Sequence, residues 1–324
     1  MTVRSLLSIL ADGKFHSGSE LGENLGISRS AIWKHIRRLE ETGLEIYSVK
    51  GRGYRIPGGL DLLDVAQIRS GLNEEVEAKL NHCSLELVAE STNEQAMNAC
   101  QKDNCHGYLY LAEQQTAGRG RRGRPWISPF ARNLYFSLVW RFERGIGALE
   151  GLSLLVGLSL VKALEKLDVE GVKLKWPNDL LFEDKKLAGI LIEVNGEASG
   201  QCQVVIGVGV NVDMPVLTAE EIDQPWVDLN FIRGGKVSRN QLLAEVINEL
   251  VMQLQVFQEK GFSSLVGEWQ HYNAHQNQAV TLQLGNGEVT GTCLGVDASG
   301  ALVLETDKGR EIFFGGEVSL RRAL

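Results

Sequence analysis

The chain has 324 residues, of which 44% are hydrophobic and 23% charged, a composition that excludes a disordered or collagen-like protein. At roughly 100–200 residues per domain, two or three domains are expected. The formal charge of −8 at pH 7, taken alone, argues against a protein that binds nucleic acid.

The cysteines and the apolar runs indicate the compartment. The cysteines are odd in number and lack C-x-x-C spacing, which disfavours disulfides and zinc and favours a reducing compartment; they are Cys83, Cys100, Cys105, Cys202 and Cys293. The apolar run 6–10 is too short for a signal peptide. The eleven-residue stretch 151–161 is too short to cross a bilayer, which takes about 20 residues. We expect a soluble, cytoplasmic protein, and we assign no metal-ligating residues.

The charge is unevenly distributed along the chain. Residues 1–60 carry nine Lys/Arg and six Asp/Glu, a net +3, which leaves 24 and 35, a net −11, for residues 61–324. A basic N-terminal head therefore precedes an acidic body.

The head has the pattern of a winged helix-turn-helix. A first helix is expected over 3–11, and Ser17-x-x-Glu20 is a capping box that opens a second helix ending near residue 24. A third helix begins after Ser28 and runs to about residue 42, with an inward apolar stripe at 32, 36 and 39. Two short strands, 46–49 and 54–56, flank a basic, glycine-rich hairpin tip.

The polar face of the third helix and the wing predict DNA contacts. The candidate DNA-binding residues are Arg29, Ser30, Trp33, Lys34 and Arg37 on the helix and Lys50 and Arg52 on the wing. The alternative is a small helical bundle with a solvated charged face, in which Trp33 packs against a neighbouring element. DNA binding is favoured because both the turn and the wing fit.

The body after Pro57-Gly58-Gly59 alternates helices and strands. Strands are predicted at 85–89, 108–113, 133–140, 173–176, 179–182, 186–194 and 203–212, and helices at 93–101, 146–167 and 240–260. In the tail, close turn signals such as Gly285-Asn286-Gly287 predict a small β barrel. The expected domains are 1–62, 63–272 and 273–324.

An arginine- and glycine-rich stretch is the most informative segment of the body. Four arginines and three glycines lie within 118–124, and residues 114–142 contain six arginines and no acidic residue. Glycines let backbone N–H groups approach an anion, and arginines add fork-shaped donors. A phosphate-binding loop is favoured over an RGG-like nucleic-acid segment or a flexible basic loop, because the stretch lies between two predicted strands.

Three further segments have the composition of ligand sites. Ser91-Thr-Asn-Glu94 is either a helix cap or a polar ligand site at a helix N-terminus. In the segment 175–193, Lys186 enters an apolar strand three places before Gly189, which predicts a cation near a ligand; the alternative is a solvated hairpin. Gly207-Val-Gly-Val-Asn211 is followed by no helix, so it is no dinucleotide fingerprint and indicates a strand on which a flat group rests.

Together these motifs resemble the biotin–protein ligases. The matching motifs are S-T-N, G-R-G-R-R-G-R, K-W-P-N-D, K-L-A-G-I-L and G-V-N-V, and the likeness extends through the tail motif at 316–321. Pro125 departs from the family, in which lysine often precedes the tryptophan. The head resembles the subgroup that also represses the biotin operon. The implied fold is α+β: an N-terminal winged helix-turn-helix, a central mixed sheet with helices as in class II synthetase-like ligases, and a C-terminal SH3-like β barrel.

The resemblance implies a two-step reaction. The family forms biotinyl-5′-AMP from biotin and ATP with Mg²⁺, then transfers biotin to a lysine of the biotin carboxyl carrier protein of acetyl-CoA carboxylase. By motif position, the adenylate-binding residues are Ser91, Thr92, Asn93, Gln115, Gly118, Arg119, Gly120, Arg121, Lys186 and Gly189, with Trp126 and Asn211 on the adenine side. Arg119, Arg121 and Lys186 would offset the repulsion between two anions. Asp179 either helps remove the acceptor lysine's proton or orients the ligand.

The resemblance also implies regulation and leaves alternatives. The adenylate would act as a corepressor that promotes a homodimer, and the dimer would bind operator DNA. A lipoate-type ligase is disfavoured by the Arg/Gly loop and the head. A ligand-sensing repressor without catalysis is disfavoured because Lys186, Arg119 and Arg121 are all retained. A ligase with an inert helical head is disfavoured by the basic wing.

Overall fold

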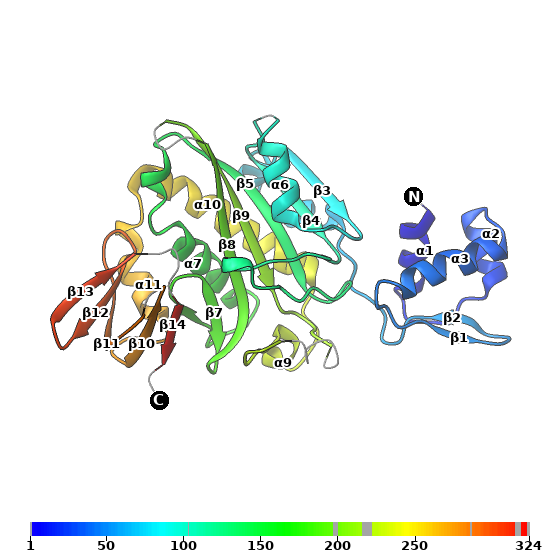
Figure 1. Ribbon diagram of the computed structural model, residues 1–324. Coiled ribbons are helices and arrows are strands. Elements are labelled where there is room, and N and C mark those ends of the chain that lie inside the picture. Colours follow the sequence, from blue (N-terminus) through cyan, green and yellow to red (C-terminus); the bar gives the residue numbers. More distant parts are fainter. Residues whose placement is uncertain are drawn as a thin grey trace.

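The computed structural model describes residues 2–102, 104–196, 200–215, 222–285, 287–314 and 319–322, with the helices and strands shown in Figure 1. Asn286 of the predicted tail turn and residues 316–318 of the tail motif lie outside the described residues.

The head folds as the sequence predicts, into three helices and a wing. Its elements are α1 (Thr2–Leu10), α2 (Gly18–Leu25), α3 (Arg29–Glu40), β1 (Tyr47–Val49) and β2 (Gly53–Arg55). The capping box at Ser17 and Glu20 is formed, and the Ser28 side chain accepts a hydrogen bond from the Ala31 N–H. The apolar stripe of α3 is buried against leucines of α1, which leaves the opposite face of α3 to solvent.

A seven-stranded mixed sheet forms the centre of the body. Its spatial order is β3 (His82–Glu86), β4 (Tyr108–Ala112), β5 (Leu134–Phe142), β9 (Cys202–Val210), β8 (Lys185–Gly196), β7 (Asp179–Phe182) and β6 (Lys173–Lys175). Only β3 and β4 are parallel among these pairs. The strand predicted at 85–89 lies at 82–86, because the chain beyond it turns toward the 113–117 segment, where Ala89 bridges Gln115.

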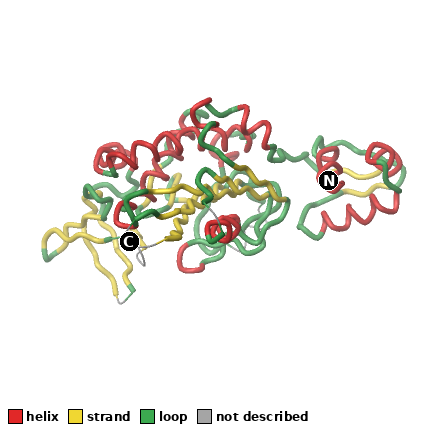
Figure 2. Tube along the Cα trace, turned by 90° about the horizontal axis from the view of Figure 1, so that it is seen from above, coloured by secondary structure: helices red, strands yellow, loops and turns green. Residues whose placement is uncertain are grey.

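Helices cover the two faces of this sheet unequally (Figures 1 and 2). The long helices α7 (Leu152–Glu165) and α10 (Arg239–Lys260) form a layer on one face, and α6 (Thr92–Cys100) packs on β4, β5 and β9 from the other. Alternate residues of β9 serve the two faces. Val204, Ile206 and Val208 join the core with α7, whereas Val205 packs against Ala96 of α6.

The prediction of one helix over 146–167 is wrong, because this segment forms two separate helical elements. A 3-10 turn, η2 (Ile146–Leu149), precedes α7, and Gly151 between them has φ +78°, a conformation that ends one helix before the next begins. By length and composition alone, Ile146–Glu165 would be apolar enough to cross a membrane. In the described structure, however, the α7 part of this stretch is a core helix, with eleven of its residues buried.

Several short helices were not predicted, because each is shorter than the window in which a helical period can be recognised. They are α4 (Val65–Ser70), α5 (Glu74–Glu77), η1 (Arg121–Gly123), α9 (Leu229–Arg233), η3 (Ser263–Leu265) and α11 (Val266–Tyr272).

The tail forms a five-stranded antiparallel sheet. Its strands are β10 (Ala279–Leu284), β11 (Gly287–Val296), β12 (Leu302–Thr306), β13 (Gly309–Phe313) and β14 (Ser319–Arg322), in the order β13-β12-β11-β10-β14. Its buried residues continue the core of the central sheet. Trp176 Nε1 donates to the Gly300 carbonyl at 3.0 Å, which fixes the two sheets together. The predicted α+β class, with its helix-turn-helix and central mixed sheet, is confirmed, and the part predicted as an SH3-like β barrel is this five-stranded antiparallel sheet.

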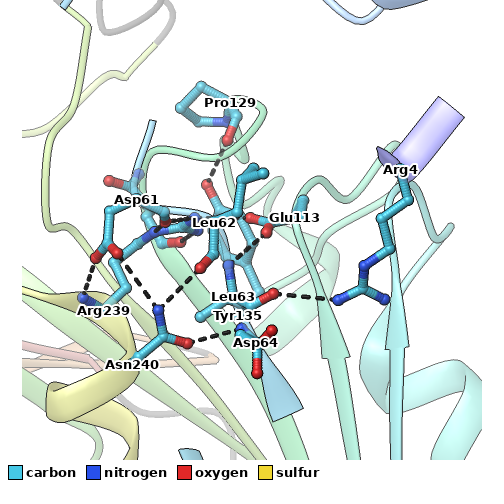
Figure 3. A network of polar contacts seen from close by, with 11 residues as sticks. Arg4, Asp61, Leu62, Leu63, Asp64, Glu113, Pro129, Tyr135, Arg239 and Asn240 are labelled. Carbon is cyan, nitrogen blue, oxygen red and sulfur yellow. Dashed lines mark hydrogen bonds and ion pairs between the residues drawn. The ribbon is translucent and has the colours of Figure 1, made fainter. Parts of the chain in front are cut away.

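A buried arginine anchors the linker between the head and the body (Figure 3). Arg239, the first residue of α10, is 2% exposed and pairs with Glu113 at 2.8 Å. Its guanidinium also donates to the carbonyls of Asp61, at 2.9 Å, and Asn133, at 3.0 Å. Glu113 in turn accepts the Leu63 N–H at 2.7 Å. The linker is therefore fixed to the ends of β4 and α10.

The head also contacts the body directly. Arg4 Nη2 donates to the Leu63 carbonyl at 3.2 Å, as Figure 3 shows, and the Gln114 side chain donates to the Thr42 carbonyl at 3.0 Å. Phe130 of the body is buried in the same cluster as the head's own core residues. The head is thus packed on the body and not merely tethered to it.

Replacing the buried arginine should destabilise the protein strongly. Arg239→Met leaves the Glu113 carboxylate buried without its cation, so we expect a loss of about 3–5 kcal/mol in the free energy of unfolding, measured in urea. Adding Glu113→Gln should recover part of that loss. As a control, Lys166→Met removes an exposed partner of Glu249, which like Arg239 belongs to α10. This substitution should lower the free energy of unfolding by less than about 1 kcal/mol. Equal effects of the two single variants would contradict this account.

Candidate functional site

A cleft of about 590 Å³ lies on the α6 side of the central sheet. Its walls come from the N-terminus of α6, the Arg/Gly loop, the turn at 175–179, β8, β9 and the segment 223–225. The cleft brings together most of the predicted adenylate-site residues: Ser91, Thr92, Asn93, Gln115, Arg119, Gly120, Arg121, Trp126, Asp179, Lys186 and Gly189. Among its lining residues, Gly118 and Asn211 are absent.

The N-terminus of α6 presents a fixed polar network to the cleft. Gln115 Oε1 accepts from the Thr92 N–H at 2.9 Å and from its hydroxyl at 3.2 Å. The Ser137 hydroxyl contacts Asn93 Oδ1 at 2.6 Å and Thr92 Oγ1 at 2.8 Å. Ser91 occupies the N-cap position but makes no side-chain capping bond. The Ser91 side chain therefore does not act as a helix cap, and the ligand-site interpretation of this segment stays a prediction.

Glycines of β8 and β9 form a floor on which other groups rest. A Cβ on Gly207 would lie 1.9 Å from Asn93 Oδ1, and one on Gly209 would lie 2.5 Å from Trp126 Cε2. A Cβ on Gly189, which pairs with Gly209, would lie 3.0 Å from Trp126 Cζ3. The flat group on this strand is thus the indole ring of Trp126, which forms one wall of the cleft.

The Arg/Gly loop is an ordered hairpin. Trp126 N–H donates to the Gly118 carbonyl at 2.8 Å, and Gly120 N–H donates to the Arg124 carbonyl at 2.7 Å. The tip turns through Arg122, which has φ 58°. A Cβ on Gly118 would lie 2.8 Å from Trp126 O, which explains why glycine occupies this position at the base of the hairpin.

Two arginines join the hairpin to the opposite side of the cleft. Arg119 pairs with Glu193 of β8 at 3.0 Å, and Arg121 donates to Asn178 Oδ1 at 3.1 Å. Burial lowers the pKa of the Arg121 guanidinium from its usual value, an effect that the nearby Asp179 carboxylate opposes. Arginine stays charged despite such a shift, so the hairpin carries fixed cations over the cleft.

Lys186 is held at the centre of the cleft by an ion pair. Its ammonium lies 2.9 Å from Asp179 Oδ1 and 5.4 Å from the centroid of the Trp126 ring. The Lys186 backbone forms a parallel β-bridge with Trp226. In this bridge the Lys186 N–H donates to the Pro225 carbonyl at 2.9 Å, and the Val227 N–H donates to the Lys186 carbonyl at 3.0 Å. The segment 225–227 thus extends β8 beside the cleft, which the sequence analysis did not predict.

Asn211 and His275 occupy unexpected positions. Asn211 is 3% exposed and donates to the carbonyls of Val227 and Lys186 at 3.2 and 3.3 Å, so it anchors the segment 225–227 from behind. His275, which follows α11, lines the cleft because Ala274 N–H donates to the Leu174 carbonyl at 2.8 Å. No local motif marks His275, because its position depends on a contact between distant segments.

The candidate DNA-binding residues lie apart from the cleft, in the head. All seven are exposed: Arg29, Ser30, Trp33, Lys34, Arg37, Lys50 and Arg52. Trp33 is 50% exposed, and the Arg37 guanidinium carbon lies 5.4 Å from its ring centroid. Trp33 therefore belongs to the surface of α3 and not to the core of the head.

Family models match three separate stretches of the chain. The chain matches the family models for an HTH domain over residues 2–55, the biotin/lipoate A/B protein ligase family over 86–211, and the biotin protein ligase C-terminal domain over 275–321. The model over 86–211 describes biotin and lipoate ligases together, whereas the C-terminal model describes biotin protein ligases.

Individual relatives extend over nearly the whole chain. The bifunctional ligase/repressor BirA of Salmonella typhimurium is 42% identical, with 98% of this chain and 97% of that protein covered. Its Escherichia coli counterpart is 41% identical over the same shares. A biotin protein ligase from Aquifex aeolicus, solved in complex with biotin and ATP, is 31% identical with a TM-score of 0.65, covering 75% of this chain and 100% of that one. The chain therefore belongs to the family of bifunctional biotin ligase/repressors.

Proposed function

We propose that this protein forms biotinyl-5′-AMP from biotin and ATP and transfers the biotin to a lysine of the biotin carboxyl carrier protein of acetyl-CoA carboxylase. The observation that carries the proposal is the cleft, in which a fixed polar network and three cations face one space.

The proposed domains are 1–62 for DNA, 63–272 for biotin and ATP, and 273–324 for the C-terminal domain, and the proposed compartment is the cytoplasm.

The polar end of the cleft suits the neutral head of biotin. Thr92 and Gln115 offer hydroxyl and amide groups that are hydrogen-bonded to each other before a ligand arrives, and Ser91 adds a second hydroxyl beside them. Gly118 and Gly120 act through the backbone, because they bring the hairpin close to this network. Gly189 keeps the β8 floor low enough for a ligand to lie against it.

The cationic part of the cleft suits the reaction itself. The biotin carboxylate must attack the α-phosphorus of ATP, forming a new P–O bond while pyrophosphate leaves with the electrons of the broken one. Two anions approach in this step, and Arg119, Arg121 and Lys186 would offset their repulsion and stabilise the developing charge. A guanidinium has five N–H donors, so Arg119 can bind an anion while paired with Glu193.

Asp179 is better suited to orientation than to proton transfer. Its carboxylate already lies 2.9 Å from the Lys186 ammonium, and both side chains are largely buried. Such a pair fixes the lysine until a substrate anion competes for it. We therefore assign Asp179 the role of holding Lys186 in place during adenylate formation.

The adenine and the metal would occupy the remaining space. Trp126 offers a ring already seated on Gly209, and Asn211 would act through the segment 225–227.

Mg²⁺ usually binds through one or two carboxylates and the substrate's phosphates, and Asp184 and Asp223 line the cleft. When bound with ATP, the ion would neutralise phosphate charge. The described residues contain no group of three or more His, Cys, Asp or Glu side chains that could hold a metal, so the phosphates would supply the other ligands.

The head would read operator DNA. Its segment 27–56 carries seven basic and three acidic residues, a net +4, and α3 and the wing expose the seven candidate contacts. We propose that the adenylate-bound protein forms a homodimer whose two heads bind the two halves of the operator.

One paired experiment tests both activities. ATP-dependent biotin labelling of a carrier domain is measured beside binding of operator duplex, with and without biotin and ATP. We expect labelling, and duplex binding that strengthens with both ligands and weakens steeply with salt. Duplex binding without labelling would indicate a repressor that has lost catalysis. Labelling with lipoate in place of biotin would indicate the lipoate-type alternative.

Lys186 should be required for adenylate formation. Because Lys186→Ala removes a cation aimed at the reacting phosphate, we expect the rate of adenylate synthesis to fall about 10²–10³-fold, measured by pyrophosphate release. Lys185→Ala, one residue earlier on β8, is the matched control, because Lys185 is exposed and lies over Phe231 instead of the cleft. Similar rates for the two variants would contradict the assigned role.

The glycine floor should control nucleotide binding. In Gly209→Ala the new Cβ would lie 2.5 Å from the Trp126 ring, which must shift away from its present position. We expect the KM for ATP to rise about tenfold while the affinity for biotin is retained. Gly235→Ala, which meets no atom within 4 Å, serves as the control. An unchanged KM for ATP in Gly209→Ala would argue against Trp126 as the adenine wall.

A further inference from the structure

Glu193 occupies a position on β8 that connects two parts of the ligand site. Gly189 is the last residue of β8 that pairs with β7, whereas the pairing with β9 continues to Gly196. Glu193 lies on this extension. It is absent from the lining of the cleft, and its side chain is 26% exposed.

The Glu193 carboxylate binds one partner from each side of the site. Arg119 Nη2 lies 3.0 Å from Glu193 Oε1 and 3.4 Å from Oε2. Asn93 Nδ2 donates to Oε2 at 2.8 Å. One partner belongs to the Arg/Gly hairpin, and the other belongs to the N-terminus of α6.

Both partners are themselves fixed to the cleft. Asn93 Oδ1 contacts the Ser137 hydroxyl at 2.6 Å, and that hydroxyl also contacts Thr92. Arg119 bridges Pro125 across the hairpin, so its backbone is set by the opposite arm. A carboxylate that binds both residues therefore closes the hairpin onto the network of α6.

The second link across the cleft lies where a substrate would bind. Arg121 binds Asn178, and both residues line the cleft, so an incoming phosphate competes for this contact. The Arg119–Glu193 pair has its carboxylate outside the cleft, so it can persist when the cleft is filled. It is the link suited to keeping the hairpin closed over a bound intermediate.

We propose that Glu193 is a positioning residue that holds the Arg/Gly hairpin closed and thereby retains the adenylate until the acceptor lysine arrives. This inference rests on the proposed function, because it requires an adenylate intermediate. Retention matters chemically, since a mixed anhydride that escapes the closed site is lost to water or to other amines.

Glutamine is the discriminating replacement at this position. A carboxylate has two acceptor oxygens, one for each partner, whereas a side-chain amide has one acceptor and two donors. In Glu193→Gln the single oxygen can serve Asn93, but the amide NH₂ then faces the donors of Arg119. The variant should keep the α6 network and lose the hairpin link.

The experiment measures release of the adenylate by full-length protein. Each variant is loaded with biotin and labelled ATP, and loss of labelled adenylate is followed after adding excess unlabelled adenylate, with no carrier domain present. Because a charge-assisted bond in a partly exposed place is broken, we expect about three- to tenfold faster release from Glu193→Gln. Its affinity for biotin should stay within about twofold of wild type, since the link to Asn93 is kept.

Two further variants separate positioning from general destabilisation. Glu143→Gln removes a carboxylate that pairs with Arg141 at 3.1 Å on the same sheet and should release adenylate at the wild-type rate. Glu193→Asp keeps both oxygens on a shorter side chain and should show an intermediate rate at an unchanged melting temperature.

Each outcome has a defined meaning. Release from Glu193→Gln at the wild-type rate would overturn the inference. Parallel losses of biotin affinity and adenylate retention would overturn it as well, because they would indicate a merely structural role. If wild-type protein formed no adenylate at all, the proposed function itself would fail, which distinguishes the two cases.

Discussion

The site depends on two positions of β9 that carry no side chain. Asn93 and Trp126 lie so close to Gly207 and Gly209 that a Cβ at either position would overlap them. Because side chains alternate along a strand, Val204, Ile206 and Val208 of β9 point to the other face and build the core with α7. One strand therefore supplies both the rigid core and the open floor on which Asn93 and Trp126 lie.

The cations of the cleft are stabilised before any substrate binds. Arg119 pairs with Glu193, Arg121 with Asn178, and Lys186 with Asp179. An unpaired cation in such a partly buried place would be costly, and it would adopt many conformations. A polar or acidic partner removes both costs and leaves spare N–H donors for an anion. The acidic body and the basic loop, which looked contradictory in the charge count, are thus parts of one arrangement.

The sequence predicted what is local and missed what is not. The capping box at Ser17 and Glu20, the period-2 strands and the Arg/Gly stretch depend on neighbouring residues, so the head, the sheet and most of the cleft could be predicted. The break at Gly151 was missed because a single glycine inside a predicted helix does not reveal which backbone conformation it will adopt. Asn211 was predicted on the adenine side, and the structure buries it behind the segment 225–227, outside the lining of the cleft. The places of Glu193 and His275 follow from pairing between segments that are distant in sequence, which no spacing rule encodes.

The end of β4 connects the two halves of the molecule. Three consecutive residues each bind a different part of the molecule. Glu113 binds the linker at Leu63, and Gln114 binds the Thr42 carbonyl just beyond α3. Gln115 binds Thr92 at the ligand site. One short stretch just beyond β4 therefore serves the head and the cleft at once. The same stretch leads into the Arg/Gly hairpin. Arg239 fixes this stretch through its buried ion pair with Glu113, so the head and the hairpin share one rigid support. A displacement of that support would therefore alter contacts in the DNA-binding head and in the ligand cleft together.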